Sequence, residues 1–438
     1  MNDIRPFRGV RYDEGVVGPL GSVLCPPYDV ISPNELRALQ NSSPFNMVRL
    51  ELPTDRPEDD SFNTRYRRAA KTMARWMAEG ELREDREPAF YLYEQQFEHQ
   101  GATRTRRGLL ASLRLADWEE GVVLPHEETM AKPKEDRLNL MRATSANLSP
   151  LFLLFDDPSG GASQLMARVA EAEPDFTAET PNGQIHRVWL VAGPVQARLA
   201  AALEQPQLFM ADGHHRYETA LSYRAERRAA DPQGSPDAAY NYALVLLVDA
   251  RDPGMVVLPT HRLVRGIERS ALARLDDTLP GQFNLEKVDC GCDDPKCMSE
   301  ALVARLAEIG RDRPALGIYR KGNAMVVSPR PEALEQAGVP VAGGRPLLDV
   351  DLLHDMILSP LLDIGDEELR AGSHVVYTRD GAEALGAVNR GDAQAAFLLN
   401  PTQVEQVLET ARAAGRMPQK STYFYPKPVT GLVVRRLG

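Results

Sequence analysis

The chain has 438 residues, a hydrophobic fraction of 43% and a formal net charge of −11 at pH 7. This length accommodates two or three domains, and the hydrophobic fraction is that of a globular protein. The acidic balance argues against a nucleic-acid binder or a membrane-surface binder, because each needs a basic face. We therefore expect a protein that acts on a small molecule, with no membrane partner and with nucleic acid disfavoured as a partner.

Targeting signals are also missing from the sequence pattern. No stretch reaches the roughly 18 apolar residues of a membrane span, and the N-terminus lacks the apolar region of a signal peptide. Four cysteines are too few for a disulfide framework in a chain this long. We expect a cytoplasmic protein; the oligomeric state stays open, with a homo-oligomer among the alternatives.

Three of the cysteines cluster, and this raises the question of a metal loop. Cys290, Cys292 and Cys297 stand in a C-x-C-x4-C pattern. This spacing differs from the common zinc patterns, and no fourth cysteine or histidine follows nearby. We expect a structural role for the three thiols, with metal binding left open.

The first part of the chain alternates expected helices and strands. Ser32 is suited to cap a helix that follows it, and residues 63–84 have the spacing of a charged, amphipathic helix. Residues 46–52 (NMVRLEL) are expected to form a strand, on which Arg49 and Glu51 share one face. The structural alternative is that these two side chains only pair with side chains of a neighbouring strand on the surface of the sheet.

Several strands are expected in the middle of the chain. Residues 90–100 and 103–115 predict two strands joined by a turn. Residues 148–157 and 186–193 predict two more, with a helix near 163–173 between them. Together these elements indicate an α/β (α+β) fold whose sheet order the sequence does not reveal.

Two apolar runs between residues 241 and 264 flank the turn residues Asp252-Pro253-Gly254, which predicts a hairpin. Residues 268–345 form a less distinctive α/β stretch. The remaining C-terminal elements are expected to be a helix over 349–361, strands near 373–377 and 394–399, a helix over 402–415 and a final strand, GLVVRRL.

The most informative stretch is ADGHHRYETA, which begins at Ala211. A short apolar run (206–210) precedes it, Gly213 supplies a tight turn, and a helix-like segment follows. A strand–turn–helix junction of this kind presents backbone N–H groups and the positive end of the helix dipole to an anion. His214, His215 and Arg216 add cationic donors where a phosphate would bind. A polar helix cap is the structural alternative.

Other segments carry more polarity than their flanks require. A histidine and a glutamate next to a basic helix resemble an acid/base pair beside an anion clamp, although surface ion pairs would also explain part of that helix. Two later segments carry hydroxyl groups beside cationic side chains, a combination that suits contact with an oxyanion. The side chains in question are His126, Glu127, Lys134, Arg137, Asn147, Thr260, His261, Arg262, Lys420, Ser421 and Thr422.

Six motifs in order resemble the landmarks of one bacterial family, a conserved domain of unknown function, and the similarity runs nearly end to end. The motifs are PPYDVIS (26–32), PHEET (125–129), KEDRLNLMRATSANLSPLF (134–152), ADGHHRYETAL (211–221), LPTHRL (258–263) and MPQKSTYFYPK (417–427).

Within that family, the D-G-H-H-R turn resembles the phosphate-binding turn of the ParB/sulfiredoxin fold. The resemblance implies a ParB/sulfiredoxin-like catalytic region over residues 1–265 and an additional α/β C-terminal region over 266–438 that contributes the MPQKST loop to the site. One branch of that fold comprises free serine kinases, which carry a similar D-G-H-x-R motif. The implied reaction is phosphoryl transfer from ATP, ADP or pyrophosphate to a free hydroxyl amino acid, with L-serine giving O-phosphoserine.

Phosphoryl transfer requires neutralisation of phosphate charge, Mg²⁺ and a base for the acceptor hydroxyl. Gly213, His214, His215 and Arg216 are expected to bind the donor phosphates, and Asp212 to serve as the Mg²⁺ ligand. Either Glu51 or Glu127 is expected to be the general base. The other polar side chains named above, together with Arg49, are expected to bind the substrate carboxylate or the terminal phosphate.

Two other functions stay open on the sequence. A ParB-like nucleotide-binding regulator would use the same turn, although the acidic charge and the lack of a clear helix-turn-helix count against it. A metal-dependent phosphohydrolase would use His214, His215 and Glu218, of which His214 and Glu218 share a helical face. A sulfiredoxin-like redox enzyme is disfavoured, because it needs a cysteine in the turn.

Overall fold

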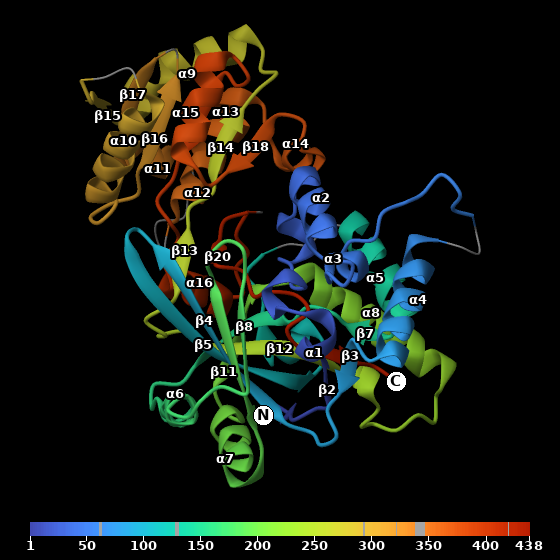
Figure 1. Ribbon diagram of the computed structural model, residues 1–438. Coiled ribbons are helices and arrows are strands. Elements are labelled where there is room, and N and C mark those ends of the chain that lie inside the picture. The colour runs from blue at the N-terminus through green and yellow to red at the C-terminus, as the bar shows by residue number, and fades with distance from the viewer. Residues whose placement is uncertain (61–63, 128–130, 292–293, 321, 338–346, 419) are drawn as a thin grey trace. The chain divides into compact units, whose positions relative to one another are not determined.

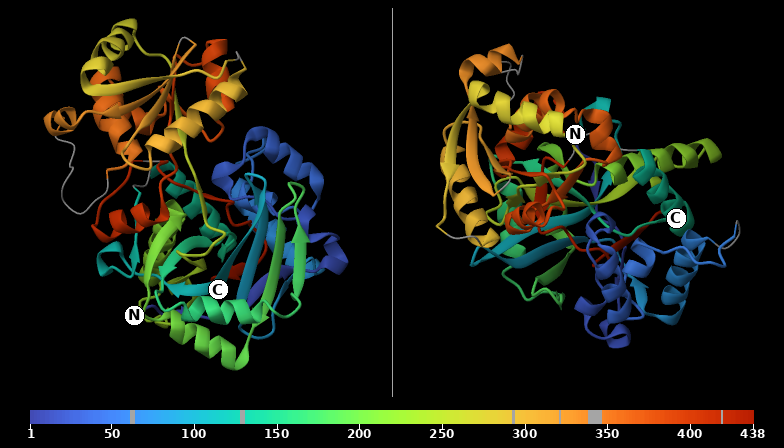
Figure 2. Two further views of the ribbon diagram at one scale, coloured as in Figure 1. Left: turned by 90° about the vertical axis from the view of Figure 1, so that its left-hand side faces the viewer. Right: turned by 90° about the horizontal axis from the view of Figure 1, so that it is seen from above.

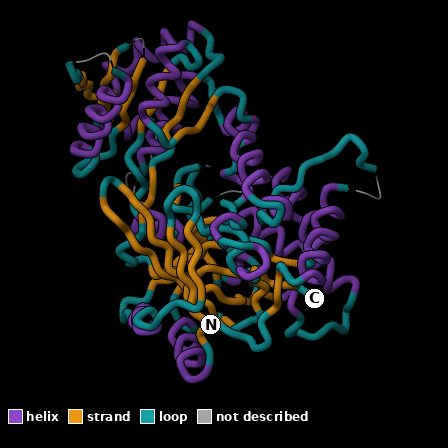
Figure 3. Tube along the Cα trace, viewed as in Figure 1, coloured by secondary structure: helices purple, strands orange, loops and turns teal. Residues whose placement is uncertain are grey.

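The computed structural model describes residues 1–438 except 61–63, 128–130, 292–293, 321, 338–346 and 419. The described chain has the mixed α/β structure that the sequence pattern predicts, with helices and several sheets (Figures 1 and 3). It divides into two compact units. Unit 1 comprises Met1–Pro125, Thr129–Met255 and Pro426–Gly438, and unit 2 comprises His126–Glu128 and Val256–Tyr425.

The resemblance to the family implied a single boundary at residue 265, whereas each unit is built from more than one segment of the chain. The chain leaves unit 1 after Met255, and its last residues return to unit 1 from Pro426 onwards. The return is fixed by strand pairing, because β21 (Val434–Arg436) is antiparallel to β2 (Gly9–Tyr12) near the start of the chain. Pairing between the two ends of a chain leaves no local signal in the sequence.

The main sheet of unit 1 runs in the order β6-β11-β8-β12-β5-β4-β10-β9, and β1 also pairs with β5. The neighbours β8 and β12 are parallel, as are β11 and β6, whereas the other pairs are antiparallel. The strands are β1 (Ile4–Arg5), β4 (Phe90–His99), β5 (Ala102–Arg114), β6 (Val123–Leu124), β8 (Leu151–Asp156), β9 (Phe176–Glu179), β10 (Ile185–Val191), β11 (Gln207–Asp212) and β12 (Tyr242–Asp249).

A smaller sheet of unit 1 has the order β3-β2-β21-β7, in which β3 spans Leu82–Glu84 and β7 spans Ala146–Asn147. The expected cap at Ser32 is confirmed, since its hydroxyl accepts from the backbone of Glu35. The helices of unit 1 are α1 (Glu14–Val17), α2 (Pro33–Ser42), α3 (Val48–Glu51), α4 (Arg65–Glu79), α5 (Ala131–Thr144), α6 (Gly161–Val169), α7 (Gly193–Leu203) and α8 (His214–Ala230).

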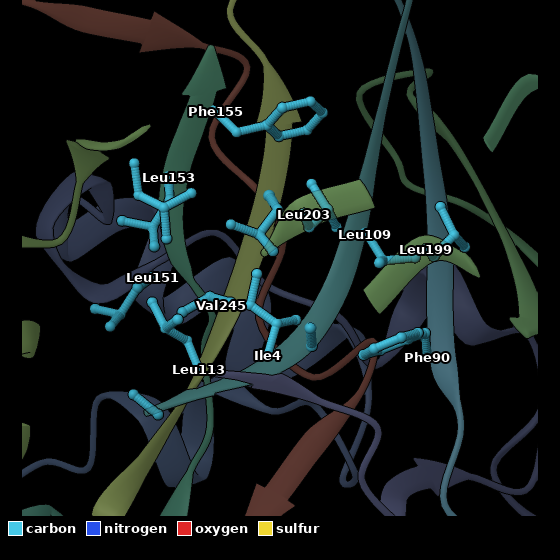
Figure 4. Packing of buried hydrophobic residues seen from close by; sticks show 14 of the residues in the cluster. Ile4, Phe90, Leu109, Leu113, Leu151, Leu153, Phe155, Leu199, Leu203 and Val245 are labelled. Atoms are coloured by element: carbon cyan, nitrogen blue, oxygen red, sulfur yellow. The ribbon is translucent and has the colours of Figure 1, made fainter. Parts of the chain in front are cut away.

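One face of the main sheet carries the hydrophobic core of unit 1. Alternate residues of each strand point to this face because side chains alternate along a strand. They pack against α6, α7 and α8, and Figure 4 shows part of the contact with α7. The core residues labelled there are Ile4, Phe90, Leu109, Leu113, Leu151, Leu153, Phe155, Leu199, Leu203 and Val245.

The strand expected over residues 46–52 is wrong, because the chain forms the short helix α3 there. Asn46 overrides the strand-like composition: its side-chain oxygen accepts from the backbone of Val48 at 3.0 Å, and its amide donates to the carbonyl of Leu24 at 3.0 Å. Arg49 and Glu51 therefore do not share a strand face, since two helical steps separate their directions by about 200°.

The hairpin expected across residues 252–254 is also wrong. All eight residues of β12 are buried, and β12 is a central strand with β5 on one side and β8 on the other. The next strand, β13 (Val256–Leu258), pairs instead with β20 (Tyr423–Tyr425). Both neighbours of β12 come from earlier parts of the chain, so the local turn does not decide the pairing.

The main sheet of unit 2 is antiparallel throughout and has the order β15-β17-β16-β19-β14-β18. Its strands provide two buried faces: Ile318 and Phe397 belong to one core, and Tyr319 and Leu398 to the other. The strands are β14 (His261–Val264), β15 (Phe283–Val288), β16 (Leu316–Arg320), β17 (Asn323–Pro329), β18 (Val375–Thr378) and β19 (Ala395–Leu398).

Helices cover both faces of this sheet. Residues of α9, α12 and α13 join the first core, and residues of α10 and α15 join the second (Figures 1 and 2). The helix expected over 349–361 is interrupted by a π-helical stretch, His354–Leu358. The α-helices are α9 (Arg269–Gln282), α10 (Pro295–Ile309), α11 (Pro331–Gln336), α12 (Asp349–Leu353), α13 (Ser359–Leu362), α14 (Asp366–Ala371), α15 (Gly381–Arg390) and α16 (Val404–Arg412).

Two further observations bear on the expectations from sequence. Among the described residues, no helix is both long enough and apolar enough to cross a membrane. Cys292 lies outside the described residues, so the expectation for the three thiols stays a prediction; of the other two, Cys297 donates its thiol to the carbonyl of Cys290 at 3.9 Å.

Candidate functional site

The strand–turn–helix junction predicted at Gly213 is confirmed. Strand β11 ends at Asp212, and α8 begins at His214. Gly213 has a φ of +98°, and a Cβ on it would lie 3.1 Å from both Arg216 Nη2 and Leu151 Cδ2. Only glycine fits here without strain, because the backbone is left-handed and Arg216 is packed against the turn. The first turn of α8 therefore presents its backbone N–H groups beside a guanidinium.

Asp212 is bound by two cations from different parts of the chain. Arg216 Nη2 donates to its Oδ2 at 2.7 Å, and Lys427 Nζ forms an ion pair with its Oδ1. Burial disfavours the charged carboxylate, but Lys427 and Arg216 outweigh it and hold the pKa of Asp212 well below its usual range. The carboxylate thus fixes two positive groups at the start of α8.

Ser149 connects this ion pair to a buried glutamate. Arg216 Nη1 donates to Ser149 Oγ at 3.0 Å and to the carbonyl of Pro150 at 2.8 Å. The Ser149 hydroxyl in turn donates to Glu51 Oε1 at 3.2 Å. Burial lowers the pKa of Arg216, but the carboxylates of Asp212, Asp29 and Glu51 outweigh burial, and the net shift is upward. Arg216 is therefore a fixed cation with carboxylates on two sides.

Arg137 holds the other side of Glu51. Its Nη1 donates to the Glu51 carbonyl at 2.6 Å and lies 3.9 Å from Glu51 Oε1. Its Nε donates to Asp136 at 2.8 Å, and its guanidinium lies 4.2 Å from the centre of the Tyr28 ring. Burial, helped by Asp29, raises the pKa of Tyr28 to about 12, so this phenol remains neutral. Acidic and basic groups thus alternate from Lys427 to Arg137.

A cavity of about 470 Å³, open to solvent, adjoins this set of charges. Glu51, Arg137, Ser149 and Arg216 supply its polar wall, and leucines of α5, β8 and β12 supply much of the rest. Asn147 also lines it, although its side-chain oxygen accepts from the backbone of Leu244 at 3.0 Å. The arrangement suits a small molecule that presents an anionic or hydroxyl group to the polar wall.

The remaining unit 1 candidates lie around this centre. His214 is buried at the first position of α8, and its charge contributes to the low pKa of Asp212. His215 occupies the next position, half-buried. Lys134 Nζ donates to Glu218 of α8 at 2.7 Å, and Arg49 donates to the carbonyl of Gln40. Arg49 is not among the residues that line the cavity.

The two histidines and Glu218 do not form a three-ligand metal site in the described part of the chain. Within the described parts of the chain, no group of three His, Cys, Asp or Glu side chains could hold a metal ion. The phosphohydrolase alternative needs Glu218 beside the two histidines, but that carboxylate accepts from Lys134 and from Trp118 Nε1. The described geometry therefore offers this alternative no support.

Unit 2 contains a second cluster of candidate residues. Glu127 Oε1 accepts from the backbone of Lys420 at 3.0 Å, and His126 Nε2 lies 3.0 Å from Thr422 Oγ1. Arg262 donates to the carbonyls of Thr260 and Lys420, the latter at 3.2 Å. The loop that carries Lys420, Ser421 and Thr422 is thereby held against β14 and the residues that precede it.

The electrostatics of this second cluster differ from those of the first. Burial lowers the pKa of Arg262 to about 10, and Tyr377 and Glu127 offset only part of that effect. Burial, with the Arg262 charge, also lowers the pKa of His261 to about 4, and His261 Nδ1 accepts from the backbone of Leu399 at 3.2 Å. Thr260, Arg262 and Ser421 line a cavity of about 500 Å³ in unit 2.

The structure thus sorts the predicted residues into two sets. Unit 1 contains Arg49, Glu51, Lys134, Arg137, Asn147, Asp212, Gly213, His214, His215 and Arg216, and unit 2 contains His126, Glu127, Thr260, His261, Arg262, Lys420, Ser421 and Thr422.

Three members of the first set were missed as site residues: Tyr28, Ser149 and Lys427. Each stands inside a motif quoted above, but no spacing rule distinguishes it from its neighbours. Lys427 is the least predictable, because it contacts a residue more than 200 positions away.

The fold and this site define a mixed α/β protein with a strand–glycine–helix turn beside two cationic side chains. The chain belongs to the family described as "Protein of unknown function (DUF1015)", whose sequence profile matches residues 4–349. No curated protein matches it.

Three solved structures are similar over about 70% of the chain. A free serine kinase in complex with AMP has 14% identity and a TM-score of 0.34, with 69% of this chain and 83% of that chain covered. A conserved hypothetical protein from Pyrococcus furiosus has 15% identity and a TM-score of 0.34, with 70% and 89% covered. SbnI with a C-terminal truncation, from Staphylococcus aureus, has 9% identity and a TM-score of 0.33, with 71% and 84% covered. Scores at this level carry no argument about activity, so we infer the function from the residues of the site.

Proposed function

We propose that this protein is a small-molecule kinase that transfers a phosphoryl group from ATP, ADP or pyrophosphate to the hydroxyl of a free hydroxyl amino acid, L-serine first among them. The phosphate-binding element would be a ParB/sulfiredoxin-like core in unit 1. One observation carries the proposal: Arg216 and Lys427 converge on Asp212 at the N-terminus of α8, beside a cavity that Glu51 also lines.

The donor phosphates would bind at the start of α8. Two fixed cations and the N–H groups of the first helical turn form an anion site that needs little reorganisation. Arg216 can bind two phosphate oxygens at once, whereas the Lys427 ammonium acts as a point charge. His214 and His215 would add hydrogen bonds to the same phosphates. Asp212 keeps the two cations together until the phosphates share them.

Glu51 is the better placed of the two predicted bases. It belongs to the same hydrogen-bonded chain as Arg216 and lines the same cavity, whereas the Glu127 carboxylate accepts from the backbone of Lys420. In the proposed step the acceptor oxygen bonds to the terminal phosphorus while the bond to the leaving phosphate breaks. The hydroxyl proton passes to Glu51, and Arg216 with Lys427 neutralises the charge on the leaving group.

Mg²⁺ fits this site as an ion carried mainly by the donor. Protein sites commonly hold Mg²⁺ through one or two carboxylates together with phosphate oxygens. Asp212 supplies one carboxylate, whose oxygens already contact Lys427 and Arg216 and each keep a further lone pair. When bound, Mg²⁺ would neutralise phosphate charge, and Asp212 would be its ligand.

The unit 2 cluster would bind a small anion at its own cavity. Arg262, Thr260 and Ser421 combine a buried guanidinium with hydroxyl groups around one cavity. Lys420, Thr422, His126, Glu127 and His261 hold the loop and the strand end that shape it. A carboxylate or phosphate would complete the partial charge compensation of Arg262.

A transfer assay tests the proposal directly. Each donor is incubated with serine, threonine and homoserine, and with alanine as the acceptor that lacks a hydroxyl, and phosphoesters are detected by phosphorus NMR. We expect a phosphoester with a hydroxyl amino acid and none with alanine. Glu51→Gln should reduce the rate by about 10²–10⁴-fold, the range for a lost general base, without loss of donor binding.

Glu94→Gln is the matched control, because Glu94 is also buried in unit 1 but pairs with Arg107 and Arg187. It should retain the rate. Absence of a phosphoester with every donor and acceptor, or full activity in Glu51→Gln, would overturn the proposal.

A further inference from the structure

A buried polar group lies on the face of the main sheet that points away from α6 and α7. On β4 and β5, Phe90, Leu92, Leu109 and Ala111 point to the helices. Because side chains alternate along a strand, Gln95 and Arg106 point to the opposite face. Both are almost fully buried, with 1% and 2% of their surface exposed.

Arg106 and Gln95 hold the backbone on both sides of Lys427. Arg106 Nη2 donates to the carbonyl of Pro426 at 2.6 Å and to Gln95 Oε1 at 2.6 Å. Gln95 Nε2 donates to the carbonyl of Lys427 at 3.3 Å. The peptide group before Lys427 and the peptide group after it are therefore both anchored to the sheet.

The same pair is fixed by its own surroundings. Gln95 Nε2 also donates to Gln184 Oε1 at 3.0 Å, and the Arg106 guanidinium lies 4.7 Å from the centre of the Phe152 ring. Arg106 belongs to the long strand β5, which pairs with β4 on one side and β12 on the other. The anchor is thus built on rigid elements of unit 1, which favours accurate placement of whatever it holds.

Stability alone does not favour a guanidinium at this position. Burial lowers the pKa of Arg106 to about 10, and Tyr93 and Asp252 offset only part of that effect. Replacing buried charges by apolar side chains of similar volume is often neutral or stabilising. An arginine at this position is better explained by its role in holding another residue in place than by a contribution to the free energy of folding.

The group that Arg106 holds in place is the ammonium of Lys427. The side chain runs from the anchored backbone to Asp212 and is 7% exposed. Lysine has four side-chain torsions, so a shift of its backbone would move Nζ away from Asp212 and from a phosphate shared with Arg216. Misplacement of a catalytic group by about 1 Å can cost on the order of 10²-fold in rate.

We propose that Arg106 and Gln95 are positioning residues, which hold Lys427 where it can contact the donor phosphates. The inference deepens the proposed function and rests on it for the identity of the ligand. Arg106 and Gln95 touch neither phosphate nor acceptor; they act through Lys427 alone.

A double-mutant cycle tests this dependence, with pyrophosphate as the probe and calorimetry as the measurement. Lys427→Met should weaken pyrophosphate binding by about tenfold or more, the loss expected for a charge-assisted contact. Arg106→Gln should weaken it by about three- to tenfold. The double variant should bind within about twofold of Lys427→Met, because two residues that act through one contact are not additive.

Arg107→Gln is the matched control, since it removes a neighbouring arginine of β5 whose guanidinium pairs with Glu94. It should bind pyrophosphate like the wild type. Multiplied losses in the double variant, or unchanged binding in Arg106→Gln, would overturn the positioning role. If Arg106→Gln does not fold, Gln95→Met removes the contact to Lys427 without loss of a buried cation.

A second readout does not depend on any ligand. Acetylation of Lys427 by acetic anhydride, followed by mass spectrometry, reports whether its ammonium is held against Asp212. We expect slow modification in the wild type and in Arg107→Gln, and modification at least about threefold faster in Arg106→Gln, with partial rescue in Arg106→Lys. If Arg106→Gln is modified faster but neither the wild type nor any variant binds pyrophosphate, the positioning role is retained and the proposed function is rejected. Equal modification rates in the wild type and Arg106→Gln would reject the positioning role.

Discussion

Unit 1 and unit 2 each have a largely buried arginine in a candidate binding cluster, but the two arginines have different partners. Arg216 lies between carboxylates, and its pKa is shifted upward despite burial. Arg262 donates to two backbone carbonyls and faces Tyr377, and burial lowers its pKa to about 10. The positive charge of the guanidinium is therefore compensated by carboxylates in unit 1 and mainly by backbone carbonyl dipoles in unit 2.

The difference suggests a different task for each cluster. In unit 1 the cations are held in place by Asp212 and can be shared with the phosphates of a donor. In unit 2 the loop carbonyls hold Arg262 in place, and an anionic ligand would supply the charge that the protein leaves partly uncompensated.

Asp212→Asn should cause the largest loss of stability. It leaves Arg216 and Lys427 buried without their shared carboxylate, and removal of one partner from a buried ion pair costs about 3–5 kcal/mol. Urea unfolding with detection of unit 1 would measure the change in the free energy of unfolding. A loss below about 1 kcal/mol would show that the two cations do not depend on Asp212.

Unit 2 should lose stability between pH 6.5 and pH 4 because of His261. Its pKa is about 4 in the folded chain, chiefly through burial, with Arg262 lowering it further and Asp380 opposing that effect. Below pH 6.5 the unfolded chain binds a proton that the folded chain does not, so stability falls as pH falls, by up to about 3 kcal/mol.

The variant His261→Asn isolates this effect, because asparagine keeps an acceptor for the backbone of Leu399 but does not titrate. Asp349 acts in the opposite direction: burial raises its pKa to about 6, so it favours the folded state as pH falls. We therefore compare unfolding free energies of wild type and variant at each pH. Parallel pH profiles would contradict the titration of His261.

Gly213→Ala should destabilise unit 1 by about 1–3 kcal/mol and weaken pyrophosphate binding as well. The backbone there has a positive φ, and a new Cβ would press on Arg216. Gly193→Ala is the matched control, since Gly193 has a φ of +67° but no atom within 4 Å of the position that a Cβ would occupy. It should lose stability only, by about 1 kcal/mol. Equal binding losses in both variants would contradict the special role of the turn.

Glu226→Gln should have the smallest effect. It breaks a contact with Arg142 in which both side chains are more than 40% exposed, and pairs of this kind contribute less than about 1 kcal/mol. Thermal unfolding should shift little and pyrophosphate binding not at all. A loss of stability comparable with that of Asp212→Asn would contradict the claim that the Asp212 ion pairs contribute more to stability than exposed ion pairs do.

Much of the site could be predicted because it is local. The strand, the glycine and the helix start at residues 207–214 follow one another in sequence, so periodicity and turn chemistry were sufficient. The cap at Ser32 was predictable for the same reason. Local rules failed at residues 46–52, where a single asparagine side chain replaces strand pairing by a helical turn.

The partners of the turn could not be predicted, because they come from distant segments. Lys427, Ser149 and Glu51 reach the neighbourhood of Arg216 through tertiary contacts between distant segments, which no local sequence pattern encodes. The same holds for β12, whose neighbours are β5 and β8 rather than the strand that follows it.

Calorimetry of pyrophosphate binding to the wild type, Arg216→Gln and Arg262→Gln tests whether the start of α8 is a phosphate site. If the start of α8 binds the donor phosphates, Arg216→Gln should weaken binding by at least about tenfold, while Arg262→Gln should bind like the wild type. Unchanged binding in Arg216→Gln, or a loss confined to Arg262→Gln, would contradict a phosphate site in unit 1.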